Sequence, residues 1–152
     1  MSAEAPNRPS SEERTMTVRM LDPLDLRLDA VIDSVPAARH QLVSWLSRSQ
    51  VDRETRDELA LVITELVTNA VEASPGANAQ VEVRAEVADG PQVVLTVSDA
   101  GSGFQIATSP RLPGGAAIRG RGLPIVNALM DGLEVRRIEG RTRVRTIRAV
   151  RS

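Results

Sequence analysis

A carboxylate and an amide stand four residues apart in the middle of the chain, in the segment Glu65-Leu-Val-Thr-Asn69-Ala. Residues with this spacing share one face of a helix, and here that face borders the apolar stripe. The oxygen atoms of Glu65 and Asn69 could bind Mg²⁺, a hard cation that prefers them, or the carboxylate could accept a proton from a hydroxyl group. The pair could also be a solvated flank, since Glu58 and Glu72 fall on nearly the same side.

A second group follows an apolar run that is typical of a strand, and it reads Asp99-Ala-Gly101-Ser-Gly103-Phe. A carboxylate at a strand end can accept a hydrogen bond from the exocyclic amine of a ligand. Glycines allow the backbone to bend and to approach that ligand closely. A glycine-rich turn, with Asp99 as a local turn former, is the alternative.

A third group consists of two glycines, Gly120 and Gly122, directly before Leu-Pro-Ile-Val. Glycines at the start of a helix expose unpaired N–H groups, and the helix dipole favours an anion there. Pro124 suits an early helical position because it has no N–H to leave unpaired. The pattern predicts a phosphate site, although Gly-x-Gly alone is a weak signal.

Composition excludes several other chemistries. The chain has 152 residues with one histidine, no cysteine and 19 basic residues that are all arginine. Disulfides, thiol catalysis, cysteine-ligated zinc, a histidine-rich metal site, Schiff bases and a Walker A lysine are therefore excluded. The formal net charge of −1 argues against non-specific binding to nucleic acid or to an anionic membrane. Because no signal peptide or membrane-spanning run is found, we expect a cytoplasmic protein.

The periodicity of the chain predicts one domain over residues 16–152, preceded by a disordered tail over residues 1–15. Residues 16–21 could form a short edge strand. The elements expected after it are a strand at 24–30, a helix at 35–47 capped by Ser34, a helix from Asp52 or Thr55 to about 74, a hairpin at 81–87 and 92–98, a loop at 101–122, a helix at 123–131, and a hairpin at 133–138 and 141–150. A loop of that length in a compact domain is usually functional.

This order of elements predicts an α+β fold, a two-layer sandwich in which three helices cover one face of a mixed, mostly antiparallel sheet. It lacks the regular alternation of a Rossmann fold. Trp45 falls on the core stripe of the first helix and His40 points away from it. In the last strand, Thr142 faces inward with Val144 and Thr146. The outward row could be a docking patch for an acidic partner or a solvated strand face: Arg141, Arg143 and Arg145.

The three groups, in this order and on these elements, resemble the N, G1 and G2 boxes of the GHKL ATP-binding (Bergerat) fold. Gyrase, histidine kinases, heat-shock chaperones and MutL-type repair proteins share it. The resemblance covers about residues 24–150 and is strongest to the anti-sigma-factor serine kinases of that superfamily. Ser-Val-Pro-Ala-Ala-Arg39 is similar to a segment of that family, and Arg39 lies 26 residues before Glu65.

The resemblance implies that ATP and Mg²⁺ are bound. Asn69 would coordinate Mg²⁺ on the triphosphate, Glu65 would be the general base that activates a protein serine, and Arg39 would contact the protein partner. Asp99 would bind the adenine amine, and Thr142 is the candidate for supporting the adenine end. Four glycines would shape the adenine pocket and hold the phosphates: Gly101 and Gly103 for the base, and Gly120 and Gly122 for the phosphates.

The resemblance further implies a protein serine kinase that phosphorylates an anti-sigma-factor antagonist, sequesters a sigma factor and forms a homodimer, as relatives often do. It implies no direct contact with nucleic acid or membrane. The segment 109–119 contains no lysine, and its departure from the family pattern leaves a second hypothesis open. In that hypothesis the chain is a nucleotide-binding interaction module that regulates a partner without phosphoryl transfer. A third, an ATPase that transfers phosphate to water, would need a second domain to use the cycle.

Overall fold

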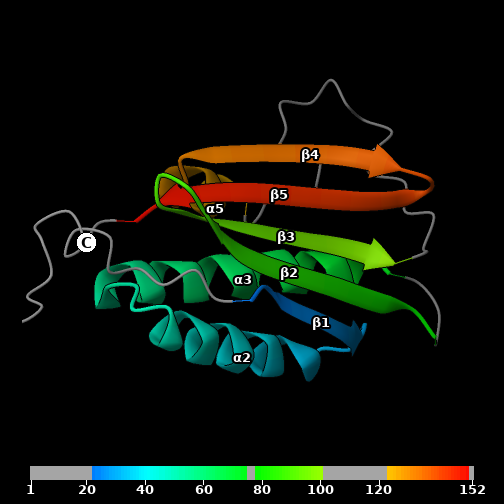
Figure 1. Ribbon diagram of the computed structural model, residues 1–152. Helices are drawn as coiled ribbons and strands as arrows, with labels where there is room; N and C mark the ends of the chain where they lie inside the picture. Colours follow the sequence, from blue (N-terminus) through cyan, green and yellow to red (C-terminus); the bar gives the residue numbers. More distant parts are fainter. Residues whose placement is uncertain (1–21, 75–77, 101–122, 151–152) are drawn as a thin grey trace, which may run out of the picture.

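A five-stranded sheet and a layer of three helices make up the computed structural model, which describes residues 22–74, 78–100 and 123–150 (Figure 1). In chain order the elements are β1 (Leu24–Asp29), α2 (Ser34–Arg48), α3 (Arg53–Ala73), β2 (Gln80–Ala88), β3 (Gln92–Ala100), α5 (Leu123–Leu129), β4 (Gly132–Ile138) and β5 (Arg141–Ala149). The predicted α+β two-layer fold is confirmed.

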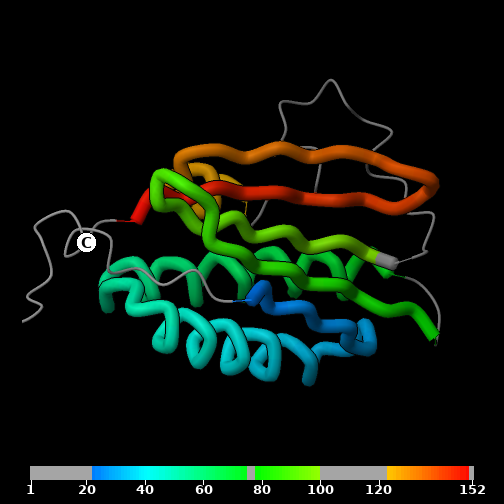
Figure 2. Tube along the Cα trace, in the orientation of Figure 1, coloured from blue at the N-terminus to red at the C-terminus, as the bar shows by residue number. Residues whose placement is uncertain are grey.

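The strand order in the sheet is β1-β2-β3-β5-β4, so β1 and β4 form its two edges (Figure 2). Every pair of neighbouring strands among the described residues is antiparallel, and the expectation of a mixed sheet is corrected in this respect. The last hairpin turns at Glu139 and Gly140, which both have positive φ, as a two-residue turn of this kind requires. This hairpin returns the chain so that β5, and not β4, pairs with β3.

The core lies between the helices and one face of the sheet. All five apolar residues of the predicted stripe on α2 are buried: Val35, Ala38, Leu42, Trp45 and Leu46. On β2 the buried residues alternate with exposed or half-buried ones, which reflects the period of two of a strand with one covered face. The indole nitrogen of Trp45 donates a hydrogen bond to the carbonyl of Asp22 at 2.9 Å, and His40 is exposed.

The two long helices begin differently. At the start of α3, Asp52 is the N-cap, and its carboxylate accepts a hydrogen bond from the backbone N–H of Thr55 at 3.0 Å. The prediction that Ser34 caps α2 is wrong by one residue, because Asp33 holds the N-cap position and no side chain caps this helix. The expected tail, the edge strand at 16–21 and the loop at 101–122 lie outside the described residues. Within the described ranges, no helix is long and apolar enough to span a membrane.

Candidate functional site

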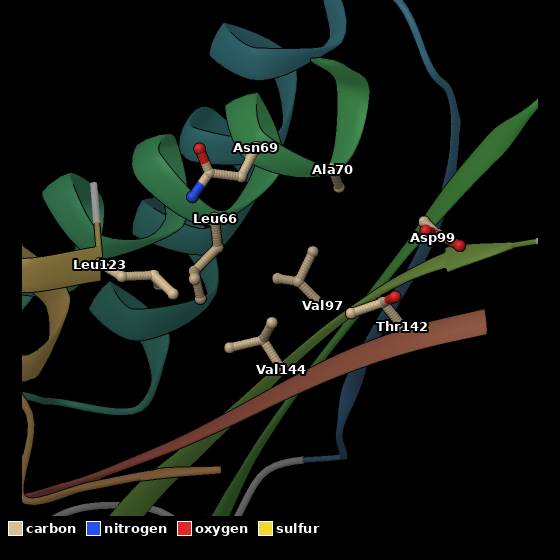
Figure 3. Close-up of a pocket in the computed structure, with 8 residues that line it drawn as sticks. All are labelled: Leu66, Asn69, Ala70, Val97, Asp99, Leu123, Thr142 and Val144. Carbon is tan, nitrogen blue, oxygen red and sulfur yellow. The ribbon is translucent and has the colours of Figure 1, made fainter. Parts of the chain in front are cut away.

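A pocket opens between α3, the ends of β3 and β5, and the first residue of α5 (Figure 3). Most of its wall is apolar, and three polar side chains project into it. Asn69 comes from α3, whereas Asp99 and Thr142 come from the neighbouring strands β3 and β5 and lie side by side (Figure 3). The remaining lining residues are Leu66, Ala70, Val97, Leu123 and Val144.

The register of the sheet explains why the strand residues meet. Val97 of β3 pairs with Val144 of β5, and both face the helices. Asp99 lies two residues after Val97 on β3, and Thr142 lies two residues before Val144 on β5. Because the strands are antiparallel, both steps run toward the same end of the sheet, and both residues stay on the face that is turned to the helices. Asp99 is 2% exposed and Thr142 is 6% exposed. The predicted inward orientation of Thr142 is therefore confirmed.

The helix wall of the pocket follows from spacing on α3. Leu66, Asn69 and Ala70 lie at positions i, i+3 and i+4 and share one face. Leu123 begins α5 and is 1% exposed. Its side chain points toward Leu66, and together these two leucines close the apolar side of the pocket (Figure 3).

Two polar atoms in this pocket have no hydrogen-bond partner among the described residues, Nδ2 of Asn69 and Oγ1 of Thr142, and both are buried. A buried polar atom without a partner costs about 1–3 kcal/mol, so such atoms are uncommon unless a ligand or water completes them. A half-turn of the amide would exchange the nitrogen and oxygen of Asn69. The pocket therefore offers a hydroxyl, a carboxylate and an amide to a ligand whose body is apolar.

Other predicted site residues lie around this pocket or outside the described ranges. Glu65 is half-buried on α3, one turn before Asn69, but it is not among the residues that line the pocket. Arg39 is exposed on α2, away from the pocket lining. Four glycines of the predicted site lie outside the described residues: Gly101, Gly103, Gly120 and Gly122. The undescribed segment that contains them begins directly after β3 and ends directly before Leu123.

The donor set can be compared with what Mg²⁺ needs. Across the described residues, no group of three or more Asp, Glu, His or Cys side chains is placed so that it could hold a metal ion by itself. Mg²⁺ in nucleotide sites usually keeps several waters and is held by one or two side-chain oxygens together with substrate phosphates. The amide of Asn69, with Glu65 one turn away, fits such a site and does not resemble a closed protein cage.

The apolar walls were not singled out as site residues by the sequence. Leu66 and Val144 were placed correctly on inward faces, but as general core. Leu66 follows Glu65, and Val144 lies two residues after Thr142 on the same strand face. The signal that could have found them is this adjacency to the polar candidates, combined with the pairing of β3 with β5.

The sequence matches the family described as the histidine kinase-like ATPase domain over residues 28–148, and the chain belongs to this family. The inferred membership of the GHKL superfamily is thereby confirmed. A search of curated proteins finds no match.

Three solved structures share the fold. The RsbU and RsbW domains of Rv1364c from Mycobacterium tuberculosis match with a TM-score of 0.68 and 24% identity, over 87% of this chain and 33% of that chain. The histidine kinase domain of a blue-light activated kinase from Erythrobacter litoralis EL346 matches with a TM-score of 0.50 and 27% identity, over 64% of this chain and 45% of that chain. The SiaB-SiaC complex from Pseudomonas aeruginosa matches with a TM-score of 0.57 and 15% identity, over 97% of this chain and 99% of that chain. The chain thus spans less than half of the first two.

Proposed function

We propose that this protein is an ATP-dependent protein serine kinase of the anti-sigma-factor type. It would phosphorylate an anti-sigma-factor antagonist and sequester a sigma factor. The observation that carries the proposal is the pocket in which Asp99 and Thr142 form a polar end between apolar walls, opposite Asn69. Membership of an ATPase domain family supports it, as does the similarity in fold to a structure that contains an RsbW domain.

The adenine base fits the chemistry of the strand side. The carboxylate of Asp99 can accept a hydrogen bond from the exocyclic amine, and the hydroxyl of Thr142 can donate to a ring nitrogen. The apolar walls would contact the faces of the ring and exclude water, which strengthens both hydrogen bonds. With the base over the paired ends of β3 and β5, its triphosphate would extend past the start of α5 toward α3.

Asn69 would hold Mg²⁺ through its amide oxygen, and the ion would neutralise charge on the triphosphate. Glu65, one turn earlier on α3, would accept the proton of a serine hydroxyl of the partner. The serine oxygen then forms a bond to the γ-phosphorus while the bond from that phosphorus to the β–γ bridging oxygen breaks and ADP leaves. Arg39, exposed on α2, would contact the protein that presents this serine.

Transfer of label from γ-labelled ATP to a panel of antagonist-domain proteins tests the proposal. Glu65→Gln should abolish transfer while ATP binding remains. Glu72→Gln is the matched control, since it removes the same charge from an exposed position seven residues later on α3. Tight ATP binding without transfer to any member of the panel would refute kinase activity.

The position of Glu65 favours a second candidate function. Because this carboxylate lies outside the residues that line the pocket, the chain could bind a nucleotide and regulate a partner without phosphoryl transfer. Partner regulation would then survive Glu65→Ala unaltered. A kinase would lose its regulation of the antagonist in the same variant.

A further inference from the structure

One arginine side chain contacts or belongs to three elements that line the pocket: α3, α5 and β5. Arg148 of β5 has a side chain that is only 13% exposed. It forms an ion pair with Glu58 of α3, and its Nη1 donates a hydrogen bond at 2.8 Å to the carbonyl of Leu129. Leu129 is the last residue of α5. A single guanidinium therefore joins β5, α3 and the C-terminal end of α5.

The contact with Leu129 occupies a carbonyl that the helix itself leaves without a partner. The last four carbonyls of a helix lack intrahelical donors, and a cation is favourable at this end of the helix dipole. Asp131 reinforces the same junction, because its Oδ2 accepts a hydrogen bond from the backbone N–H of Ala149 at 2.6 Å. The backbone N–H of Asp131 also donates to the carbonyl of Ile147 at 2.8 Å, so these three hydrogen bonds fix the end of α5 to β5.

The partner of Arg148 on α3, Glu58, lies on the same face of this helix as Glu65. Glu58 lies seven residues before Glu65, which places the two on the same side of the helix after two turns. The sequence left open that this row of carboxylates is a solvated flank, but Glu58 is half-buried and paired with Arg148. The arginine consequently fastens α5 along the face of α3 that carries Glu65 and Asn69.

The other end of α5 is a wall of the pocket. With seven residues, α5 is about 10 Å long, and Leu123 at its start lines the pocket (Figure 3). A helix of this length moves as one body, because its turns share backbone hydrogen bonds. A shift at Leu129 is therefore transmitted to Leu123 and changes the shape of the site.

We propose that Arg148 is a positioning residue for the pocket: with Glu58, it sets the distance between α5 and α3 and thereby holds Leu123 against Leu66. The inference rests on the proposed nucleotide binding. Arg148 itself touches no ligand, since it is not among the residues that line the pocket. Its effect on ligand affinity would pass through the placement of α5.

Calorimetric titration with ATP–Mg²⁺ tests the inference in the full chain. Arg148→Met keeps most of the side-chain volume but removes the charge, and Glu58→Gln removes the charge of its partner. Each should weaken ATP binding about two- to thirtyfold, the usual range for coupling through packed elements. The double variant should lose little more than either single one, because both break the same contact. Arg148→Lys, which keeps the charge with a shorter reach, should recover part of the affinity.

Two controls separate positioning from general destabilisation. Arg145→Met is the same change three residues earlier on β5, at an exposed position on the opposite face of the sheet. Val35→Ala weakens the core at α2, far from α5, and should lower the melting temperature without changing the affinity for ATP. If Val35→Ala and Arg148→Met lower affinity equally for equal loss of stability, Arg148 is merely structural and the inference is overturned.

Unchanged ATP affinity in a folded Arg148→Met variant would also overturn it, with the proposed function left intact. Failure of the wild-type chain to bind ATP would instead refute the proposed function. Should Arg148→Met fold poorly, Glu58→Gln and Arg148→Lys test the same contact with smaller changes. Relative to wild type, amide hydrogen exchange in these variants should then speed up more in α5 than in β2. Equal exchange in α5 of variant and wild type would overturn the inference.

Discussion

Replacing Asp99 with asparagine tests the base-binding end of the pocket with almost no change in shape. Asp99 is 2% exposed and its neighbours in the pocket wall are mostly apolar, so water cannot compensate for a lost contact. The change removes the negative charge and replaces one acceptor oxygen with an NH₂ donor. The adenine amine is itself a donor, and two donors would face each other.

The magnitude follows from the burial. A buried hydrogen-bonding group left without a partner costs about 1–3 kcal/mol, which corresponds to a loss of about 5- to 150-fold in ATP affinity. GTP presents a carbonyl oxygen where ATP presents the amine. The asparagine amide can donate to that oxygen, so Asp99→Asn should also lose the preference for ATP over GTP.

Calorimetric titrations of both nucleotides with wild type and variant provide the assay. Asp29→Asn is the matched control, because it removes the same charge from an exposed position at the end of β1. An unchanged ratio of ATP to GTP affinity in a folded Asp99→Asn variant would remove Asp99 from the base site. Thr142→Val, nearly identical in shape, should independently reduce ATP affinity about two- to tenfold through loss of one hydrogen bond.

Four other substitutions have defined outcomes. Glu65→Gln should abolish phosphoryl transfer in the labelling assay while calorimetry shows ATP binding retained. Asn69→Ala should reduce ATP affinity in the presence of Mg²⁺ but hardly without it, and equal losses in both titrations would make Asn69 structural. Leu42→Ala, at a fully buried site, should cost about 2–5 kcal/mol in urea unfolding. Asp52→Ala should cost about 1 kcal/mol near neutral pH. Burial raises the pKa of Asp52, but its hydrogen bonds with Thr55 and the charge of Arg148 hold this pKa below the ordinary 3.8. The stabilisation is therefore present above that value and lost in more acidic solution, where urea unfolding of the variant and the wild type should converge.

The elements could be predicted because their patterns are local. The stripe on α2 and the alternation on β2 each repeat with the period of one secondary structure, and one buried face is enough to create them. The start of α2 was misplaced for a local reason too. The N–H groups of Ser34 and Val35 donate to the carbonyls of Val31 and Ile32. With Asp33 at the N-cap, a cap side chain would have no donor to bind, because the N–H of Val35 is already paired with backbone and Pro36 has no N–H.

The site could be predicted only where motif residues coincide with the pocket. Asn69, Asp99 and Thr142 were named from the sequence and the structure brings them together. Their convergence depends on the pairing of β3 with β5, which no periodicity reveals, because β5 is inserted between strands that precede it in the chain. The contact of Glu58 with Arg148 joins residues 90 positions apart for the same reason, and a solvated flank was an equally consistent interpretation of the sequence.

The two sides of the pocket are held by different kinds of interaction. On the strand side, β5 has a hydrogen-bonded neighbour on each edge, so Thr142 and Arg148, both on its inner face, are fixed relative to one another by the ladder. On the helix side, Arg148 of β5 joins α3 and α5, because its guanidinium pairs with Glu58 of α3 and donates to the carbonyl of Leu129 at the end of α5. A ladder must break several backbone hydrogen bonds to shift, whereas packed side chains can repack. Any change of pocket shape on ligand binding is therefore expected in the position of α5 and not in the spacing of Asp99 and Thr142.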